Sequence, residues 1–349
     1  MKIVLNPDAN EHNYKEEINQ GKMVPAFENP SRLNHILDHF KRQGQEAFIS
    51  PQDFGLAPIA KIHDQDYLTF LQNIWHQWQV TGNQADILPS VWKAPGLNMP
   101  NSNNLTAQVG SYAFSADTPI MKGTWQAVYQ GAQSALTATQ LVCQGEKSAF
   151  ALTRPPGHHA HSALYGGYCF INNAAVAAQA ALDYCATNGT NKSHQKVAIL
   201  DVDFHHGNGT QDIFYKRNDV LTISIHGDPD NNFPYYLGNS YETGEDEGEG
   251  FNLNLPLPDG SDFTTWCEAF AKASAKIKQF APDFLIVPLG VDTYENDPIS
   301  SFKLTTDDYI TMGQMIAKLN LPTVFVMEGG YDIEPLGANV YNVIAGFEK

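Results

Sequence analysis

The strongest chemical signal in the chain is the segment DVDFHHGNGT, which covers residues 201–210 and directly follows a short apolar run. Alternate side chains of an extended backbone point the same way, so Asp201, Asp203 and His205 are expected to project together. Carboxylate and imidazole groups that converge at a strand end are typical ligands of a first-row metal ion. A helix-capping Asp with incidental histidines is the competing interpretation, which this segment alone does not exclude.

Two further strand ends carry groups of the same kind. The apolar run 284–289 is followed by Asp292, and the run 323–327 is followed by Glu328 and Tyr331. Asp292 would add a third ligand, and three protein ligands with one open position are typical of catalytic zinc sites. No cysteine belongs to this set, which excludes a zinc finger.

A fourth strand end carries a pair of histidines. The run 149–152 leads into RPPGHHA at 154–160, where Pro-Pro-Gly ends the strand in a rigid turn. His158 and His159 are candidates for a general base and acid, because imidazole titrates near neutral pH. A histidine pair in a loop is often only a surface feature, but four strand ends with such groups favour one common site.

The elements that must position these groups are short strands separated by helices. Continuous apolar runs of four to six residues are typical of strands buried on both faces of a parallel sheet. The alternation of these strands with helices predicts one α/β domain over residues 1–349. Sites in such sheets form at the carboxyl ends of the strands, where the groups described above lie. The expected strands are 2–5, 149–152, 197–200, 220–225, 284–289 and 323–327, and the expected helices are 33–40, 68–78, 124–142, 173–186, 262–280 and 306–319.

Two stretches interrupt the alternation. Residues 80–123 contain several prolines and glycines and an Asn/Ser run, and a connection of this length in a compact domain is functional or a linker. We expect an excursion from the domain rather than a domain boundary. The second stretch, YETGEDEGEG at 241–250, is rich in carboxylates and glycines and is expected to be a loop.

Composition restricts the possible partners. The chain has 349 residues, with 21 Lys and Arg against 38 Asp and Glu, which gives a formal net charge of −17. This charge argues against a nucleic-acid partner, which requires a basic surface, and it would attract a cationic ligand as well as keep the protein soluble. No apolar run is long enough to span a membrane, no signal peptide is recognised, and the four cysteines form no CxxC pair. We therefore expect a cytoplasmic protein with no membrane partner.

The chain resembles the histone deacetylase superfamily of metal-dependent amide hydrolases. The matching segments, in the order of that family, are RPPGHHA (154–160), GGYCFINNA (166–174), DVDFHHGNGT (201–210), LGVDTYENDP (289–298) and EGGY (328–331). Asn208 resembles the class II branch, and segments 112–125, 289–304 and 329–342 resemble bacterial acetylpolyamine amidohydrolases. The resemblance implies the arginase-deacetylase fold, in which a mostly parallel sheet of about eight strands lies between two layers of helices.

The resemblance also implies a role for each matching residue of the active site. His159 would be the general base with His158 beside it, and Tyr331 would donate a hydrogen bond to the developing oxyanion. Which histidine protonates the leaving amine stays open. One catalytic Zn²⁺ would be bound by Asp203, His205 and Asp292, while Asp201 and Asn208 would orient the histidines.

Substrate contacts and structural K⁺ are implied in the same way. Gly167, Tyr168 and Phe233 match positions that line the substrate tunnel of the family. Asp117 is either the partner of a distal ammonium group or a solvated turn residue. The residues that match the potassium sites are Asp201, Asp203, His205, Ser224 and Ile225 for the first, and Phe214, Arg217 and Val220 for the second.

The leading functional hypothesis is hydrolysis of N-acetylated polyamines such as acetylputrescine, acetylcadaverine or acetylspermidine. The 80–123 excursion matches the long loop with which acetylpolyamine amidohydrolases form a homodimer, and such a dimer would favour slim cationic substrates. An Nε-acetyl-lysine protein deacetylase with the same chemistry is the nearest alternative. A catalytically weak metal- or amine-binding protein is an alternative of another class.

Overall fold

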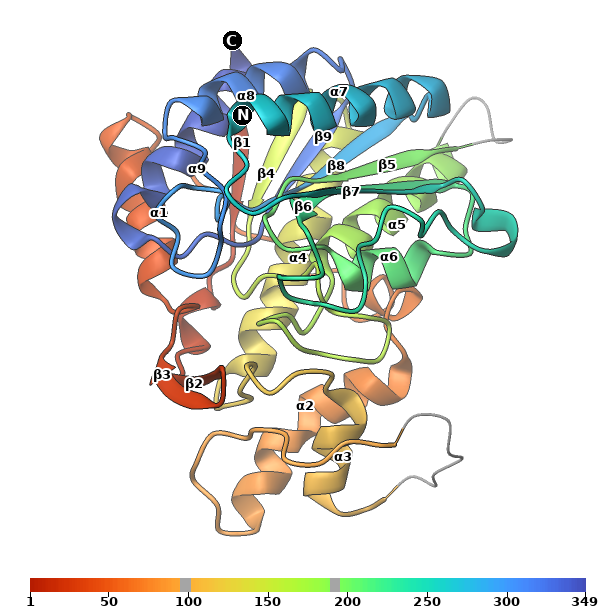
Figure 1. Ribbon diagram of the computed structural model, residues 1–349. Coiled ribbons are helices and arrows are strands. Elements are labelled where there is room, and N and C mark those ends of the chain that lie inside the picture. The colour runs from red at the N-terminus through yellow and green to blue at the C-terminus, as the bar shows by residue number, and fades with distance from the viewer. Residues whose placement is uncertain (95–101, 189–194) are drawn as a thin grey trace.

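The computed structural model describes residues 1–94, 102–188 and 195–349, and a parallel sheet lies at its centre (Figure 1). Every strand pairing in this sheet is parallel, and the strand order is β1-β4-β9-β8-β5-β6-β7. The described sheet thus has seven strands, where about eight were expected. Its strands are β1 (Lys2–Leu5), β4 (Ser148–Leu152), β5 (Val197–Asp201), β6 (Val220–Gly227), β7 (Asn252–Leu257), β8 (Phe284–Leu289) and β9 (Thr323–Met327).

Helices cover both faces of the sheet, so the molecule has three layers. The side chains of β4 alternate between two cores, with Ala149 and Ala151 in one and Phe150 and Leu152 in the other. The first core includes residues of α2 (Gln65–Val80), α3 (Leu105–Tyr112), α4 (Thr124–Cys143), α5 (Asn173–Asn188) and α6 (Asn208–Phe214). The second includes residues of α1 (Ser31–Arg42), α7 (Phe263–Phe280), α8 (Asp308–Ala317) and α9 (Ile333–Glu348). Short 3₁₀ helices span Ala9–Glu11, Ile59–Lys61 and Asp246–Gly248.

A small hairpin stands apart from the central sheet. Its strands, β2 (Glu16–Asn19) and β3 (Lys22–Pro25), are antiparallel. Gln20 and Gly21 connect them with positive φ angles, as a two-residue type I′ turn requires. Figure 1 shows the hairpin at the same end of the molecule as α2 and α3.

The segment between α2 and α4 contains the expected excursion 80–123. Within it, α3 packs near the end of α2, and Ile87 pairs with Ile120 in an isolated antiparallel bridge. The middle of the loop, residues 95–101, lies outside the described residues. None of the helices in the described ranges combines the length and the apolar character needed to cross a bilayer.

The strands that carry the predicted site residues are neighbours in the sheet. β4, β9, β8 and β5 stand side by side, and their parallel pairing places their carboxyl ends along one edge. The residues that follow these four strands therefore meet at that edge.

Candidate active site and metal centre

Three buried side chains at the ends of β5 and β8 converge as a candidate metal centre. His205 Nδ1 lies 2.9 Å from Asp292 Oδ2 and 3.4 Å from Asp203 Oδ1. Tetrahedral ligands at 2.0–2.1 Å from Zn²⁺ stand about 3.3 Å apart, so one ion fits among these three atoms. In the described part of the chain, the ion-pair partners of both carboxylates are histidines only, which leaves their negative charge for a cation.

Backbone groups fix the orientation of both carboxylates. The Phe204 N–H donates to Asp292 Oδ1 at 2.8 Å, and the Gly329 N–H donates to Asp203 Oδ2 at 2.8 Å. Asp292 Oδ2 and Asp203 Oδ1 then face the shared centre, and Asp203 Oδ1 also accepts from the His205 N–H at 2.9 Å. Close approach here requires glycine, because a Cβ on Gly290 would lie 2.0 Å from Asp203 Oδ2.

The histidine pair stands beside this centre, with ring centroids 4.0 Å apart. His158 Nδ1 lies 2.9 Å from Asp201 Oδ2, whereas His159 Nδ1 lies 2.6 Å from Asn208 Oδ1. Asn208 Nδ2 faces His161 Nε2 at 2.9 Å, so the amide oxygen is the acceptor for His159. With its Nδ1–H donated in this way, His159 keeps Nε2 free to take a proton.

The two histidines differ in pKa because their partners differ. Burial opposes a charge on His158, but the carboxylates of Asp203 and Asp201 outweigh it and raise its pKa to about 10. Burial lowers the pKa of His159, and the positive neighbour His158 lowers it further. The amide of Asn208 cannot compensate as a carboxylate would. The surroundings thus favour a charge on His158 and oppose one on His159, as expected for an electrostatic partner beside a base.

Tyr331 follows β9 and reaches the same edge. Its backbone N–H donates to Asp297 Oδ2 at 2.7 Å, and the Arg32 guanidinium carbon lies 4.7 Å from the centre of its ring. Burial raises the pKa of the Tyr331 phenol despite the nearby Arg32 charge, so the hydroxyl keeps its proton and can donate.

A buried ion cluster supports Tyr331, and sequence reasoning missed it. Glu28 accepts from Arg32 Nη1 at 3.0 Å and from Arg154 Nη2 at 3.0 Å. Arg32 also donates from Nε to the Gly330 carbonyl at 2.7 Å, directly before Tyr331. The i, i+4 spacing of Glu28 and Arg32 was the available signal, but such pairs usually lie on exposed helix faces.

Glu328, which the sequence placed at a strand end without a specific role, is a second support. Its Oε2 accepts from the backbone N–H groups of Gly157 at 2.6 Å and His158 at 3.1 Å, which ties the histidine turn to the end of β9. Burial raises the pKa of Glu328 to about 8. Cys169 lies close to both His158 and Glu328, and burial raises the pKa of its thiol, which makes it a poor nucleophile.

Aromatic rings surround the site, as expected for Tyr168 and Phe233. The Phe233 ring is perpendicular to His159 at a centroid distance of 4.9 Å, and the Tyr168 ring is 5.6 Å from Tyr331. A Cβ on Gly167 would lie 2.6 Å from the His159 ring, so this glycine leaves the space beside the base open. Phe114 stacks on Phe233 at 6.0 Å, and it is a neighbour that sequence reasoning did not identify.

Two carboxylates lie near the Tyr168 ring. Asp117 Oδ1 accepts from the Gly167 N–H at 3.1 Å and from two hydroxyls, so Asp117 is a half-buried, fixed residue rather than a freely solvated one. Glu17 of β2 accepts from the Tyr168 hydroxyl at 2.6 Å. Burial raises the pKa of Glu17 to about 7, against the Tyr168 hydrogen bond, and the Asp117 charge adds a smaller contribution in the same direction. Sequence reasoning missed Glu17 because nothing in the short segment EEIN suggests a strand beside the site.

Comparison with known proteins agrees with this geometry. Residues 26–347 match the family described as Histone deacetylase domain. The chain is 47% identical to acetylpolyamine amidohydrolase 2 of Pseudomonas aeruginosa, across 100% of this chain and 99% of that one. It is 44% identical to the acetylpolyamine amidohydrolase of Mycoplana ramosa, across 99% of each chain. The crystal structure of acetylpolyamine aminohydrolase from Burkholderia pseudomallei superimposes with a TM-score of 0.92 at 38% identity, and the match covers 99% of this chain and 98% of that one. The chain belongs to the histone deacetylase family.

Proposed function

We propose that this protein is a zinc-dependent amide hydrolase that removes acetyl groups from N-acetylated polyamines. The observation that carries the proposal is the convergence of a three-ligand metal centre, a histidine pair with unequal partners and a buried tyrosine at one sheet edge. The full-length similarity to proteins named acetylpolyamine amidohydrolases supports the substrate class.

The residues at the sheet edge supply distinct parts of amide hydrolysis. When bound by Asp203, His205 and Asp292, Zn²⁺ supplies polarisation of the amide carbonyl and a lowered pKa for a water molecule. His159 takes the proton of the attacking water at Nε2, and the histidine pair returns a proton to the leaving amine. The neutral state of His159 suits it to accept the first proton.

Tyr331 stabilises the charge that develops on the carbonyl oxygen. Its hydroxyl stays protonated and its ring is held from two sides by Arg32 and Tyr168. A preorganised donor of this kind contributes on the order of 3–4 kcal/mol to the transition state. The role of this residue is therefore to lower the barrier rather than to bind the ground state.

The surroundings of the site favour an extended cationic substrate. The rings of Tyr168 and Phe233 would pack against the methylene chain of an amine. The carboxylates of Asp117 and Glu17 near Tyr168 would attract a distal ammonium group, which an acetylpolyamine carries and a neutral acetamide lacks.

A comparison of rates tests the substrate class. We expect kcat/KM for acetylputrescine, acetylcadaverine or acetylspermidine to exceed that for an Nε-acetyl-lysine peptide by at least tenfold. Asp117→Asn should lower kcat/KM for the amines without an equal loss on N-butylacetamide, which has no ammonium group. A tenfold preference for the peptide would instead assign the protein to acetyl-lysine deacetylation.

Metal removal tests the proposed cofactor. Dialysis against a chelator should abolish turnover, and Zn²⁺ should restore it, because the three ligands hold the only cation that the chemistry requires. The metal content of the dialysed protein is measured in parallel. Turnover by protein shown to be free of metal would contradict the proposal.

We also propose K⁺ as a structural ion near the active site. Asp201 and Ser224 stand opposite each other in the register of β5 and β6, and both line a small cavity. The first candidate site is Asp201, Asp203, His205, Ser224 and Ile225, and the second is Phe214, Arg217 and Val220. Replacing K⁺ by tetramethylammonium should lower the Tm, whereas an unchanged Tm would argue against both sites.

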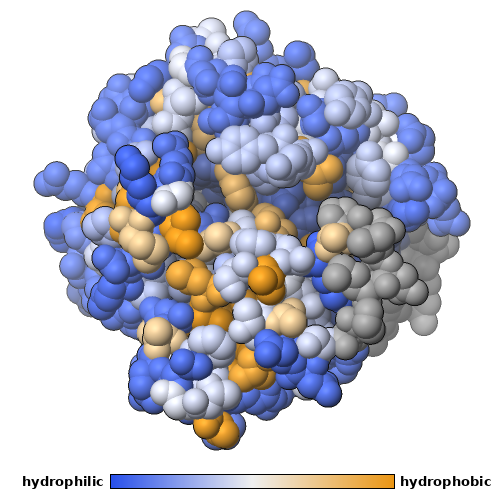
Figure 2. Space-filling view, turned by 60° about the horizontal axis from the view of Figure 1, so that its bottom comes forward, coloured by the Kyte–Doolittle hydropathy of each residue, from blue (hydrophilic) through white to orange (hydrophobic). Residues whose placement is uncertain are grey.

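We further propose one domain over residues 1–349 that forms a homodimer through the 80–123 segment. Val80, Val91 and Trp92 of this segment are exposed apolar residues. Figure 2 shows apolar side chains gathered in the middle of the face to which α2, α3 and the hairpin contribute, with hydrophilic ones around its edge. Sedimentation velocity should show a dimer that Trp92→Ser dissociates and Tyr241→Ser, a control at an exposed aromatic residue outside this segment, does not. A monomeric wild-type protein would contradict this assignment.

A further inference from the structure

Glu242 is a buried residue, although it lies in the acidic loop 241–250. Only 8% of it is exposed, and every hydrogen bond to its carboxylate comes from an amide N–H group. A buried charge without a cationic partner is retained only when hydrogen bonds replace its hydration. The donors are Gln211 Nε2 at 2.6 Å, Asn239 Nδ2 at 2.8 Å, Gly238 N at 2.9 Å and Asn254 Nδ2 at 3.2 Å.

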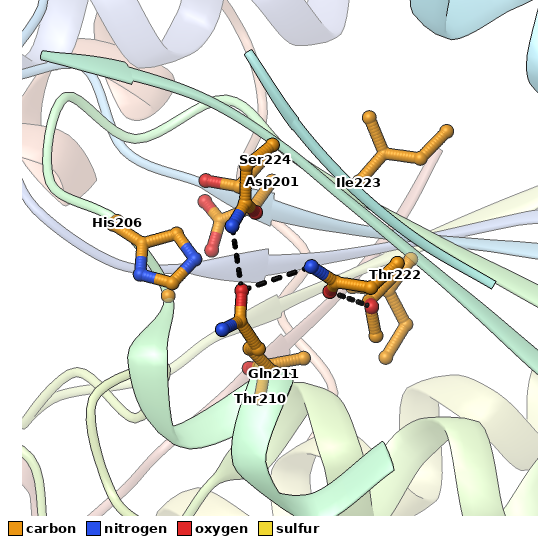
Figure 3. A pocket seen from close by; sticks show the side chains of 11 residues that line it. Asp201, His206, Thr210, Gln211, Thr222, Ile223 and Ser224 are labelled. Carbon is orange, nitrogen blue, oxygen red and sulfur yellow. Dashed lines mark hydrogen bonds between the residues drawn. The ribbon is translucent and has the colours of Figure 1, made fainter. Parts of the chain in front are cut away.

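The hydrogen bond from Gln211 to Glu242 fixes helix α6, which carries Asn208, the hydrogen-bond partner of the proposed base His159. Gln211 extends from α6 toward the sheet (Figure 3). Its Oε1 accepts from Asn254 at 2.7 Å and Asn252 at 3.0 Å, while its Nε2 donates to Glu242. Asn208 lies three residues before Gln211, on the same side of the same short helix. The position of Gln211 therefore sets the position of Asn208, whose Oδ1 accepts from His159.

A second bond fixes the loop that carries an aromatic neighbour of the same base. The Gly238 N–H donates to Glu242, and the Gly238 carbonyl accepts from His226 Nε2 at 2.9 Å. Gly238 has a φ of 114°, so glycine is required for the chain to turn between these two contacts. Phe233 precedes this fixed point by five residues, and its ring lies against His159.

We propose that Glu242 is a positioning residue for His159, because one carboxylate fixes both supports of that ring. The inference rests on the proposed role of His159 as the base. Through Gln211, Glu242 holds the helix that carries Asn208, which orients His159 by a hydrogen bond. Through Gly238, it holds the loop whose Phe233 packs on the other side of the ring. Charge-assisted bonds from one buried acceptor keep both supports in register.

A double-mutant cycle tests this coupling in the full-length zinc enzyme, with its preferred acetylated amine as substrate. Glu242→Ala should lower kcat at least tenfold while KM changes less than threefold. In an Asn208→Ala background the same substitution should lower kcat by a clearly smaller factor than in the wild-type background, because one of the two supports it acts through is already lost. Glu247→Ala, which removes an exposed charge from the same loop, should leave kcat within twofold of the wild type. Glu242→Gln keeps the shape and one oxygen acceptor and should recover part of the loss.

Equal losses of kcat from Glu242→Ala in both backgrounds, or a loss no larger than that of Glu247→Ala, would overturn the inference. If Glu242→Ala does not yield folded protein, Glu242→Gln is taken through the same cycle, and equal losses in both backgrounds again overturn it. His159→Ala distinguishes failure of the proposed mechanism from failure of the proposed role of Glu242. Full activity in that variant would overturn the proposed mechanism together with this inference, whereas its inactivity beside an additive cycle would overturn this inference alone.

Discussion

Single neighbours decide what each polar side chain at the sheet edge can do. His158 and His159 are adjacent and equally buried, yet a carboxylate faces one and an amide faces the other. The pKa of the first is therefore raised and that of the second is lowered. Sequence reasoning identified both histidines and both partners, because all four lie in two short segments that follow strands.

Removal of one oxygen tests the contribution of Tyr331. Tyr331→Phe should lower kcat by about 10²–10³-fold with little change in KM, because the hydroxyl acts on charge that develops only in the transition state. Tyr165→Phe is a matched control, since the Tyr165 hydroxyl is buried and has no hydrogen-bond partner among the described residues. Near-normal turnover in Tyr331→Phe would remove this tyrosine from the mechanism.

Glu17 gives the protein a pH dependence of stability whose sign follows from its environment. Its folded pKa is raised to about 7, whereas its ordinary value is 4.5, so the folded state holds this proton more tightly than the unfolded chain does. Between those two values the unfolded state loses the proton first, so the free energy of unfolding falls as pH rises, by about 3 kcal/mol in all. Below 4.5 this group has no effect, and above 7 the full loss is present.

Glu17→Gln should therefore flatten the decline in stability between pH 4.5 and pH 7. Urea unfolding of the variant and the wild type at several pH values measures the difference. Glu16→Gln, on the exposed side of the same strand, is the control and should follow the wild type. A Glu17→Gln curve parallel to that of the wild type across this range would contradict the prediction.

Among the structural elements, those with continuous apolar sequence could be predicted and those with polar or interrupted sequence could not. The six expected strands all occur in the sheet, because burial on both faces leaves an unbroken apolar run. β7 escaped prediction because Asn252 and Asn254 point into a polar network, so its sequence NLNLPL lacks such a run. The hairpin β2–β3 is short and charged, and Pro335 and Gly337 obscure the pattern of α9.

The same division applies to the site. Residues in the segments that follow strands were recognisable, because their types and spacing suggest chemistry. The supports Glu17, Glu28 and Arg32 lie near the N-terminus and reach the site only through the fold. Glu242 was identified as acidic, but its burial depends on donors from Gln211, Gly238 and Asn254 and could not be read from the loop itself.

Gly290, directly after β8, allows the ends of β8 and β5 to approach closely, and its substitution tests whether the metal centre needs that approach. Gly290→Ala would place a methyl group within 2.0 Å of Asp203 Oδ2 and should displace that carboxylate from the metal centre. We expect at least a tenfold loss of zinc affinity, measured by metal content after dialysis against a weak chelator. Gly131→Ala in α4 is the control, because its Cβ would meet no atom closer than 3.4 Å. Unchanged zinc retention in Gly290→Ala would show that the centre tolerates the added group.

For the whole molecule, the net charge of −17 has a kinetic consequence. A negative field raises the encounter rate of a cationic substrate, and salt screens that field over a Debye length of about 10 Å at 0.1 M. The kcat/KM for acetylputrescine should fall at least threefold between 0.02 M and 0.5 M salt, whereas that for neutral N-butylacetamide should change little. Glu242 is buried and is not counted among the charges that attract substrate. The exposed loop residues to neutralise in a test of this attraction are Glu245, Glu247 and Glu249. A salt response shared equally by both substrates would leave the charge with solubility as its only role.

The order of strands in the sheet has a consequence for when the site can form during synthesis and folding. The site unites the ends of β4, β5, β8 and β9, which are adjacent in space but spread from residue 152 to residue 327. A ribosome has therefore made nearly the whole polypeptide before Tyr331 can join the histidines. Recovered turnover during refolding should consequently count only those molecules in which all four strand ends have come together.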